Sequence, residues 1–392
     1  MPALIAIFLT VLIDMLSFGM AIPDLQLRGE SLGAHGPLLG LMLASFSITQ
    51  LLTAPFLGHW SDHVGRRKVL LTTCTMTALC FLLYSQAHSL PIMFASRILA
   101  GISGANIGVA FAYIADVTSE KDRGKGMGLV GAAFGIGFIM GPPTGAALVE
   151  LGKGGPFVLG ITAAGLAVIN LFFIWRFIPN LKPSRPPEVV GNPFTANFLN
   201  VVAALRVPRL SVLIYLFFGS TFAFSNLEST YFLLLSHRWG MPMREGAWVL
   251  AWVGIVSAVM QGYLIAKLIQ RFGEPTLMRI GYLAQAPILL SIPFTPPWVP
   301  MLFGCMLLGV ATGICSPSTS SMISRTAPSN MQGSIFGITQ SVGALGRVLG
   351  PLCGSTLFAK GPAYPYVLAA LVMLIPASLA WRVRMPGDAG VA

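Results

Sequence analysis

Apolar residues recur along this chain in runs of about 20, separated by short polar segments. A helix of about that length crosses the hydrocarbon core of a bilayer and satisfies its own backbone hydrogen bonds there. The pattern therefore predicts an all-α membrane protein with twelve transmembrane helices. The predicted spans are residues 3–23, 38–60, 69–87, 90–116, 124–149, 156–178, 209–235, 245–268, 276–294, 299–324, 332–358 and 363–383.

The composition agrees with a membrane environment. Of the 392 residues, 55% are hydrophobic and only 9% are charged, and the mean hydropathy is +0.78. A soluble chain has about 25% charged residues, and it could not hide this much apolar surface from water. The first run is interpreted as a retained span rather than a signal peptide. It is long, it contains Asp14, and no small-residue cleavage site follows it.

The positions of the cations indicate a topology. The net charge is +11, and with a cytoplasmic N-terminus seventeen of the 24 lysines and arginines fall in cytoplasmic loops and ends. Five lie outside, and Arg97 and Arg347 lie within spans. This is the positive-inside bias, whereas a nucleic-acid surface would gather cations on one soluble face. We expect a monomeric multi-pass protein among the lipids of a bacterial inner (plasma) membrane, with both termini cytoplasmic and no nucleic-acid partner.

Residues that usually carry metal or catalytic chemistry are scattered. All five cysteines lie within apolar runs without a CxxC motif, which favours small core residues over disulfides or metal ligands. His59 and His63 are four residues apart and could hold a metal, but they flank Asp62 at a span end, where a solvated face is favoured. No Ser-His-Asp order, phosphate loop or soluble domain supports an enzyme or a receptor. We expect no cofactor and no metal.

The longest polar interruption, residues 179–208, is rich in proline and divides the spans six and six. It predicts a cytoplasmic linker between two halves, residues 1–178 and 209–392. Both halves contain the motif GxxxGPxxG, as "GFIMGPPTG" from Gly137 and "GRVLGPLCG" from Gly346, at an offset of 209 residues. Six spans return a chain to the side where it began, so two such copies have the same orientation. The sequence predicts two pseudo-symmetric six-helix halves.

Three stretches carry a family resemblance. "GHWSDHVGRRKVL" resembles the signature between spans 2 and 3 of the major facilitator superfamily, with matches at Gly58, Ser61, Asp62, Gly65, Arg66 and Arg67. "SRILAGISGANIGVAFAYIAD" resembles the span-4 signature, with Arg97 and Asp116 at its ends. "GIGFIMGPPTGA" resembles the span-5 motif of antiporters, with Gly137, Gly141, Pro142 and Gly145. The type that the chain most resembles is the twelve-span drug:proton antiporter branch, which includes the tetracycline exporters.

The resemblance implies that the first stretch is a gate latch. In the family a carboxylate at the position of Asp62 lies near the start of span 11, and Arg66 would pair with Asp116. Such a cluster holds the halves together in one state and breaks in the other; the alternative is a topology signal with a helix turn. The matching positions of the second copy are Gln270 and Glu274, so we expect only the first half to keep the full latch. The latch residues are Gly58, Asp62, Gly65, Arg66, Arg67 and Asp116.

Four ionisable residues lie within predicted spans: Asp14, Arg97, Glu228 and Arg347. Each costs roughly a few kcal/mol to insert, which indicates a pathway or an ion pair. Burial favours a neutral carboxylate and a nearby cation favours the charged form, so Asp14 and Glu228 are candidate proton-coupling groups. Asp14 ranks first because it lies near the midplane and matches the exporter branch. The alternative is a pair of structural ion pairs, Asp14–Arg97 and Glu228–Arg347.

Further polar side chains that apolar helices do not need are expected to line a substrate cavity, or singly to bond one helix to another. They are Gln50, Asn106, Tyr113, Asn226, Gln261, Gln285 and Gln340, with Arg97 and Arg347 as additional binders. Tetracycline exporters carry acids in spans 3 and 9 and a histidine in span 8, where this chain has Cys80, Gln285 and Ser257. Tetracycline is therefore not the expected substrate.

The sequence predicts a secondary active transporter. The first hypothesis is proton-coupled efflux of amphipathic small molecules or drugs by alternating access. The second is symport or facilitated transport of an organic anion or lipid-like solute bound by Arg97 and Arg347. The exporter would depend on its acids, and the anion carrier on its arginines.

Overall fold

The computed structural model describes residues 2–118, 120–151, 155–179, 208–295, 303–326, 332–381 and 383. All regular structure in these ranges is helical, and the twelve predicted spans are confirmed. The helices of the first six spans are α1 (Pro2–Ser31), α2 (Pro37–Val64), α3 (Arg66–Ser85), α4 (Leu90–Gly104), α5 (Asn106–Val117), α6 (Glu120–Leu151) and α7 (Pro156–Phe177). Those of the last six are α9 (Pro208–Trp239), α10 (Met243–Val259), η1 (Met260–Leu264), α11 (Ile265–Phe272), α12 (Glu274–Ser291), α13 (Cys305–Thr326), α14 (Gln332–Phe358) and α15 (Tyr364–Ala380).

The helices have the apolar surface that lipid requires. Among the described residues, nine helical segments are long and apolar enough to cross a membrane, and α15 is a shorter apolar helix. Large hydrophobic side chains remain exposed on many of them, including Phe56, Phe172, Trp175, Trp248 and Trp381. A soluble surface rarely exposes so much apolar area. The chain is therefore an integral multi-pass membrane protein.

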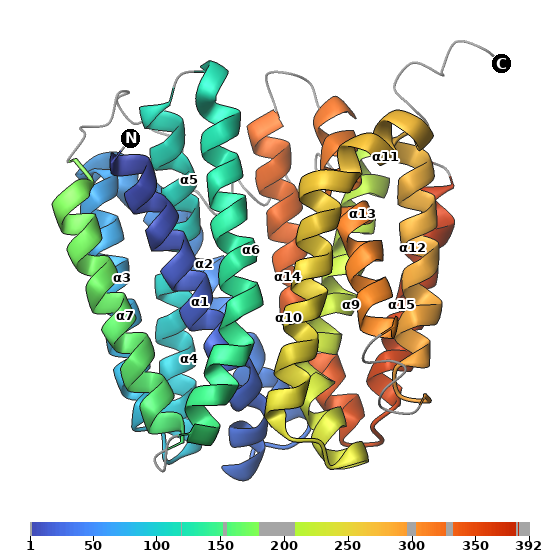
Figure 1. Cartoon of the computed structure of the whole chain (residues 1–392), viewed down its shortest axis with the longest axis horizontal. Coiled ribbons are helices and arrows are strands. Elements are labelled where there is room, and N and C mark those ends of the chain that lie inside the picture. The colour runs from blue at the N-terminus through green and yellow to red at the C-terminus, as the bar shows by residue number, and fades with distance from the viewer. Residues whose placement is uncertain are drawn as a thin grey trace. The chain divides into compact units, whose positions relative to one another are not determined.

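The chain divides into two compact units (Figure 1). The first unit comprises Met1–Ala34, Leu41–Pro193 and Met243–Ala251, and the second His35–Gly40, Phe194–Pro242 and Trp252–Ala392. Each predicted half thus supplies most of one unit, while the first residues of α2 and of α10 belong to the other. The predicted linker, residues 179–208, lies almost entirely outside the described residues, and its boundaries stay a prediction.

In the first unit α1 packs against α6 and α7, and α3 packs against α4, α5 and α7 (Figure 1). The end of this unit where α1 begins is called the proximal end, and it also holds the α2–α3 turn and the end of α5. The opposite end is called the distal end. The core between these helices includes the buried residues Leu70, Cys74, Tyr113, Ile114 and Ile174.

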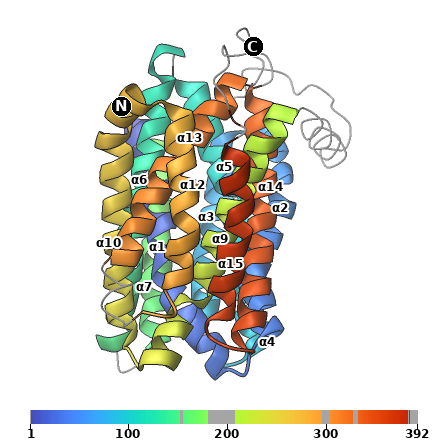
Figure 2. The same ribbon diagram turned by 90° about the vertical axis from the view of Figure 1, so that its right-hand side faces the viewer.

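In the second unit α9 packs against α13, α14 and α15, and α12 packs against α13 and α15 (Figure 2). Its proximal end, defined in the same way by the start of α9, holds the α11–α12 turn and the end of α13. The core includes Met278, Tyr282, Leu289, Met322 and Tyr366, all of them buried.

Glycines bring α6 against α1 so closely that a side chain has no room. A Cβ added at Gly141 would lie 2.6 Å from the Cα of Gly19. A Cβ added at Gly145 would lie 2.0 Å from the carbonyl oxygen of Met20. Glycine is needed at such an approach because any Cβ would force the two backbones apart. The glycine seam of the first unit consists of Gly137, Gly141 and Gly145.

The same contact recurs between α14 and α9 in the second unit. A Cβ added at Gly350 would lie 2.8 Å from the backbone nitrogen of Asn226, and one added at Gly346 would lie 3.0 Å from that of Phe222. The repeated motif of the sequence is therefore a repeated helix–helix contact.

Two irregularities depart from the predicted spans. The helix α1 continues past residue 23, through Pro23 itself, to Ser31. The eighth span contains the π-helical turn η1, a rare form that often occurs at functional sites. This turn packs on α13, where a Cβ added at Gly313 would lie 2.9 Å from the Cβ of Met260.

Candidate functional site

The first unit contains a cavity of about 50 Å³ bounded by α1, α2, α3, α4 and α5. Four residues predicted to bind substrate or protons line it together: Asp14, Gln50, Arg97 and Asn106. The rest of the wall is mostly apolar and aromatic, and includes Met15, Phe18, Phe46, Phe81, Tyr84 and Ile107. Polar groups that converge on an apolar pocket are the usual form of a small-molecule site.

Asp14 of α1 takes its hydrogen bond from an amide. The Nδ2 of Asn106 donates to the Oδ2 of Asp14 over 2.7 Å. The alternative prediction from the sequence is an ion pair between Asp14 and Arg97. The Oδ1 of Asp14 is buried and has no hydrogen-bond partner among the described residues. The side chain of Asn170, which is fully buried, lies close enough to the Asp14 carboxylate to act as a second amide neighbour. Since buried polar atoms normally find partners, Oδ1 needs a donor, which the Asn170 amide, a bound proton or a ligand group can supply.

The fourth span is interrupted beside this contact, which the sequence did not reveal. The helix α4 ends at Gly104, Ala105 is a turn residue, and α5 begins at Asn106. The Nε2 of Gln50 donates to the carbonyl oxygen of Gly104 over 2.9 Å and so satisfies the end of α4. Ala105 keeps helical dihedral angles (φ −71°, ψ −5°), so the irregularity is a single turn residue within one continuous span, next to the cavity. Two predicted cavity residues therefore flank the interruption.

Arg97 of α4 lies against the aromatic wall of the cavity and is 7% exposed. Its Cζ is 4.8 Å from the ring centroid of Phe46 and 6.0 Å from that of Phe18. The two ring centroids are 5.0 Å apart. This is cation–π geometry, and it holds a cation beside an aromatic surface in the same cavity as Asp14.

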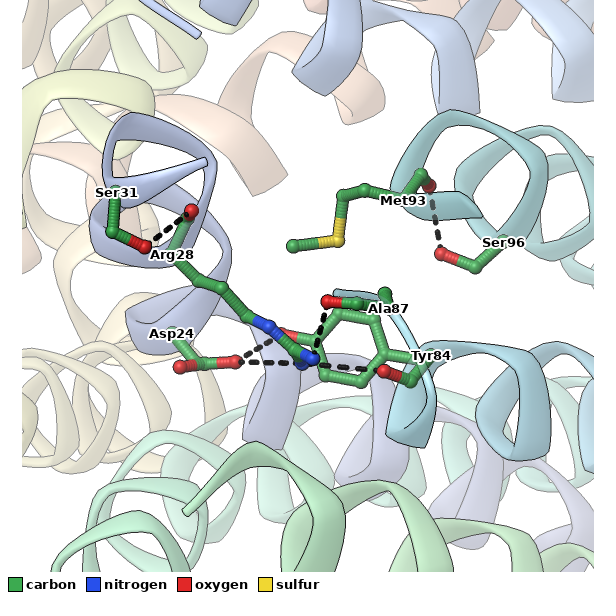
Figure 3. A network of polar contacts seen from close by, with 7 residues as sticks. All are labelled: Asp24, Arg28, Ser31, Tyr84, Ala87, Met93 and Ser96. Atoms are coloured by element: carbon green, nitrogen blue, oxygen red, sulfur yellow. Dashed lines mark hydrogen bonds and ion pairs between the residues drawn. The ribbon is translucent and has the colours of Figure 1, made fainter. Parts of the chain in front are cut away.

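A buried charged cluster at the distal end was missed by the sequence analysis (Figure 3). On α1, the Oδ2 of Asp24 lies 3.7 Å from the Nη1 of Arg28, one turn further on. The hydroxyl of Tyr84 on α3 donates to Asp24. Arg28 donates to the carbonyl oxygens of Tyr84 (3.2 Å) and Ala87 (2.6 Å), at the end of α3 where the helix dipole favours a cation. Because Tyr84 also lines the cavity, the cluster fixes its distal wall.

In the second unit, two of the predicted cavity residues are buried between helices. Asn226 is fully buried on the face of α9 that meets α14. Gln285 of α12 is also buried, and the Oγ of Ser220 donates to its Oε1 over 3.4 Å. Glu228 and Arg347 lie close enough to interact electrostatically, and an ion pair between them stays a prediction.

Three further predicted residues lie elsewhere. Gln261 of η1 and Gln340 of α14 are exposed. Tyr113 lies in the core of the first unit rather than on the cavity wall. Their roles in substrate binding stay predictions.

The predicted latch residues gather at the proximal end of the first unit. Gly65, with φ 96°, turns the chain from α2 into α3, a conformation that favours glycine. The Nη1 of Arg66 lies 2.5 Å from the Oδ1 of Asp62, and its Nε lies 3.1 Å from the Oδ2 of Asp116. The implied pairing of Arg66 with Asp116 is present, and the role of the cluster as a latch stays a prediction.

The other residues of this stretch have different contacts. Arg67 donates to the carbonyl oxygen of Trp175 on α7. A Cβ added at Gly58 would meet nothing within 4 Å, so this glycine is not needed for a close helix contact here. The Nδ1 of His63 lies 2.9 Å from the carbonyl oxygen of His59. In the described ranges, no group of three or more His, Cys, Asp or Glu side chains could hold a metal ion.

Membrane-spanning helices in two related units and a buried carboxylate on a cavity are features typical of a multi-pass membrane transporter. The model of the Major Facilitator Superfamily matches residues 7–351 and 228–390. The chain belongs to this superfamily, and it is a transporter rather than an enzyme. The resemblance seen in the three sequence motifs is confirmed.

Individual relatives cover nearly the whole chain. Multidrug resistance protein 2 of Bacillus subtilis (strain 168) is 28% identical over 366 residues, which cover 93% of this chain and 91% of that protein. Tetracycline resistance protein, class C, of Escherichia coli is 30% identical over 376 residues, covering 91% and 90%. The crystal structure of the human organic anion transporter MFSD10 (TETRAN) superposes with a TM-score of 0.72 at 26% identity, covering 97% and 99%.

Proposed function

We propose that this transporter exports amphipathic small molecules in exchange for protons, by alternating access, with Asp14 as its proton-coupling group. The observation that carries the proposal is the buried Asp14 carboxylate on the wall of an aromatic cavity, where it faces the amides of Asn106 and Asn170. An ionisable residue within the membrane is costly to bury, so it is by default a candidate functional group. A proton that crosses the membrane gains about 2.3 kcal/mol per 100 mV, which a group with alternating exposure can use.

Through the hydrogen bond between Asp14 and Asn106, protonation of Asp14 would affect the helix that begins at Asn106. An ionised Asp14 only accepts hydrogen bonds, and it accepts one from Asn106. A protonated Asp14 carries a donor and no longer holds the amide as strongly. Because Asn106 begins α5 at the break in span 4, loss of this contact would act directly on the interrupted helix.

The cavity wall suggests the substrate class. Phe18, Phe46 and Phe81 offer an apolar, aromatic surface, and Asp14 offers a negative charge to an amphipathic cation. The proton carried by Asp14 and a cationic substrate would then compete for one carboxylate. The drug-resistance relatives support this class, while Cys80, Gln285 and Ser257 still argue against tetracycline itself.

A second candidate function is transport of an organic anion. It is favoured by Arg97, whose guanidinium lies on the aromatic wall of the same cavity. A guanidinium beside an aromatic face suits a carboxylate attached to an apolar body. The similarity to the human organic anion transporter MFSD10 supports the same function. Arg347 would be the corresponding cation of the second unit.

One experiment separates the two functions. The purified protein is reconstituted in proteoliposomes that contain a pH-sensitive dye, and ethidium, benzoate and a lysophospholipid are each added outside. An exchanger of cations and protons changes the internal pH on addition of ethidium, and Asp14→Asn removes that response. A response to benzoate that Arg97→Gln removes and Asp14→Asn does not would replace the first function by the second. Arg176→Gln, at an exposed cation outside the cavity, is the control.

We further propose that the proximal ends face the cytoplasm and that the Arg66 cluster latches the gate there. The support is the cation bias of the loops and the ion pairs of Arg66. A cysteine at Ser184 should react with an impermeant maleimide only in inverted vesicles. A cysteine at His88, exposed at the distal end, should react in intact cells. The opposite pattern would invert the topology.

A further inference from the structure

The two units carry equivalent residues where a span turns back at the proximal end. Gly65 and Gly273, 208 residues apart, both have positive φ, of 96° and 75°. Each is followed by the first residue of a helix, Arg66 of α3 and Glu274 of α12. The repeat thus places an acid in the second unit where the first unit has a cation.

The partners are inverted as well. Asp116 lies next to the end of α5, and Arg325, 209 residues later, lies next to the end of α13. In the first unit the Nε of Arg66 is 3.1 Å from Asp116 Oδ2. In the second the Nη2 of Arg325 is 3.4 Å from Glu274 Oε1. Both members of the pair have exchanged sign, and the pair is kept.

We propose that Glu274 and Arg325 form a sign-inverted copy of the Arg66–Asp116 pair, and that they are positioning residues that hold α12 and α13 together at the proximal end. The sequence predicts that only the first half keeps the full latch, and the proposed pair is the part that the second half keeps. It lacks the carboxylate that Asp62 supplies, since Gln270 stands there, and it retains the ion pair. The inference goes beyond the proposed function, because it holds for any substrate and any coupling ion.

Helix dipoles make the two pairs unequal. A helix N-terminus favours an anion and a C-terminus favours a cation. Glu274 and Arg325 agree with both dipoles, whereas Arg66 and Asp116 oppose both. The second pair is therefore held more firmly, and the first is easier to release.

Burial points the same way. Glu274 is 2% exposed, and its Oε1 also accepts a hydrogen bond of 2.5 Å from the Oγ of Ser321. The side chain of Asp116 is 34% exposed. Loss of Arg325, whose own side chain is 54% exposed, would leave the buried Glu274 carboxylate with the Ser321 hydroxyl as its donor, whereas water can solvate an unpaired Asp116. The second pair is the fixed clamp, and the first is the releasable one.

The test compares Arg325→Gln with Asp116→Asn, which remove equivalent members of the two pairs. We expect Arg325→Gln to lower the unfolding temperature in detergent by roughly 5 °C or more, because it strands a buried charge, and Asp116→Asn to lower it by far less. Arg325→Lys should restore most of the loss. Arg271→Gln, at a nearby exposed cation whose Cζ lies 5.4 Å from the Phe272 ring centroid, is the control and should change little.

A second measurement separates positioning from mere stability. Downhill exchange of ethidium in proteoliposomes needs no proton coupling, so it remains informative if the proposed coupling is wrong. Arg325→Glu, which opposes two like charges, should lower the maximal rate about tenfold at nearly unchanged KM. The double variant with Glu274→Arg should recover part of the rate. Equal unfolding temperatures for Arg325→Gln and the parent, or no rescue by Arg325→Lys, would overturn the inference.

Discussion

The two units share a glycine framework and differ in where their polar side chains lie. In both, a helix with the GxxxGPxxG motif presses on the first helix of its unit. In the first unit Asp14 and Asn106 meet on a cavity wall. In the second, Asn226 and Gln285 are buried between helices. The comparison teaches that the repeat preserved helix contacts, which depend on glycine, while the polar chemistry of each copy diverged.

The two intramembrane acids illustrate the divergence. At the offset of 209 residues, Glu228 corresponds to Gly19, and Asp14 corresponds to Ala223. The acids therefore do not occupy equivalent places. Glu228 has Arg347 within electrostatic reach, whereas Asp14 has an amide for a partner. A nearby cation stabilises the ionised form of a carboxylate and so opposes protonation, whereas a neutral amide opposes it less.

The largest effect should therefore come from Asp14. We expect Asp14→Asn to abolish uphill export in proteoliposomes with an imposed proton gradient and to preserve downhill exchange of the same substrate. Asparagine keeps a hydrogen-bonding partner for Asn106 but cannot carry a proton. Glu228→Gln is the matched variant of the second unit and should retain uphill export. If Asp14→Asn keeps uphill export and Glu228→Gln loses it, Glu228 is the proton-coupling group and the second unit carries the coupling.

The next effect tests the glycine seam. Gly141→Leu should block transport or make it leaky while the protein still inserts, because a side chain there meets the backbone of Gly19. Gly135→Leu on the same helix is the control, since an added Cβ there meets nothing within 4 Å. Membrane insertion is measured by fractionation, and transport by ethidium exchange. Equal activity of the two variants would show that the seam is dispensable.

These comparisons also show how far the sequence carries. The spans, the halves and the contact of Arg66 with Asp116 follow from long periodic signals and from a motif. The break at Ala105 does not, because no proline or charge marks it and the bond from Gln50 comes from another helix. The Asp24–Arg28 cluster does not follow from the sequence either, because the apolar run that predicts the first span ends at residue 23. Burial of those charges depends on Tyr84, which is remote in sequence.

A smaller effect is expected at the Arg66 cluster. Asp62→Asn should slow exchange several-fold and leave substrate affinity nearly unchanged, because Asp62 is at the proximal end and does not line the cavity. The KM and the maximal rate of ethidium exchange separate the two quantities. Weakened binding with a normal maximal rate would place Asp62 in substrate recognition.

The smallest effect should come from Gly58, although it belongs to the same motif. Gly58 is helical and has open space around it, so Gly58→Ala should raise the unfolding free energy slightly, by about 0.5–1 kcal/mol, through helix propensity. Gly65→Ala is the contrast: the φ of 96° is strained for any residue with a Cβ, and it should destabilise the turn. Both are read out by thermal unfolding and by ethidium exchange. If Gly58→Ala is stable but exchanges ethidium slowly, another helix must approach Gly58 in a different state of the transport cycle. The glycine would then be needed only in that state. If the variant is stable and fast, only the turn at Gly65 and the charges beside it matter at this end of the first unit.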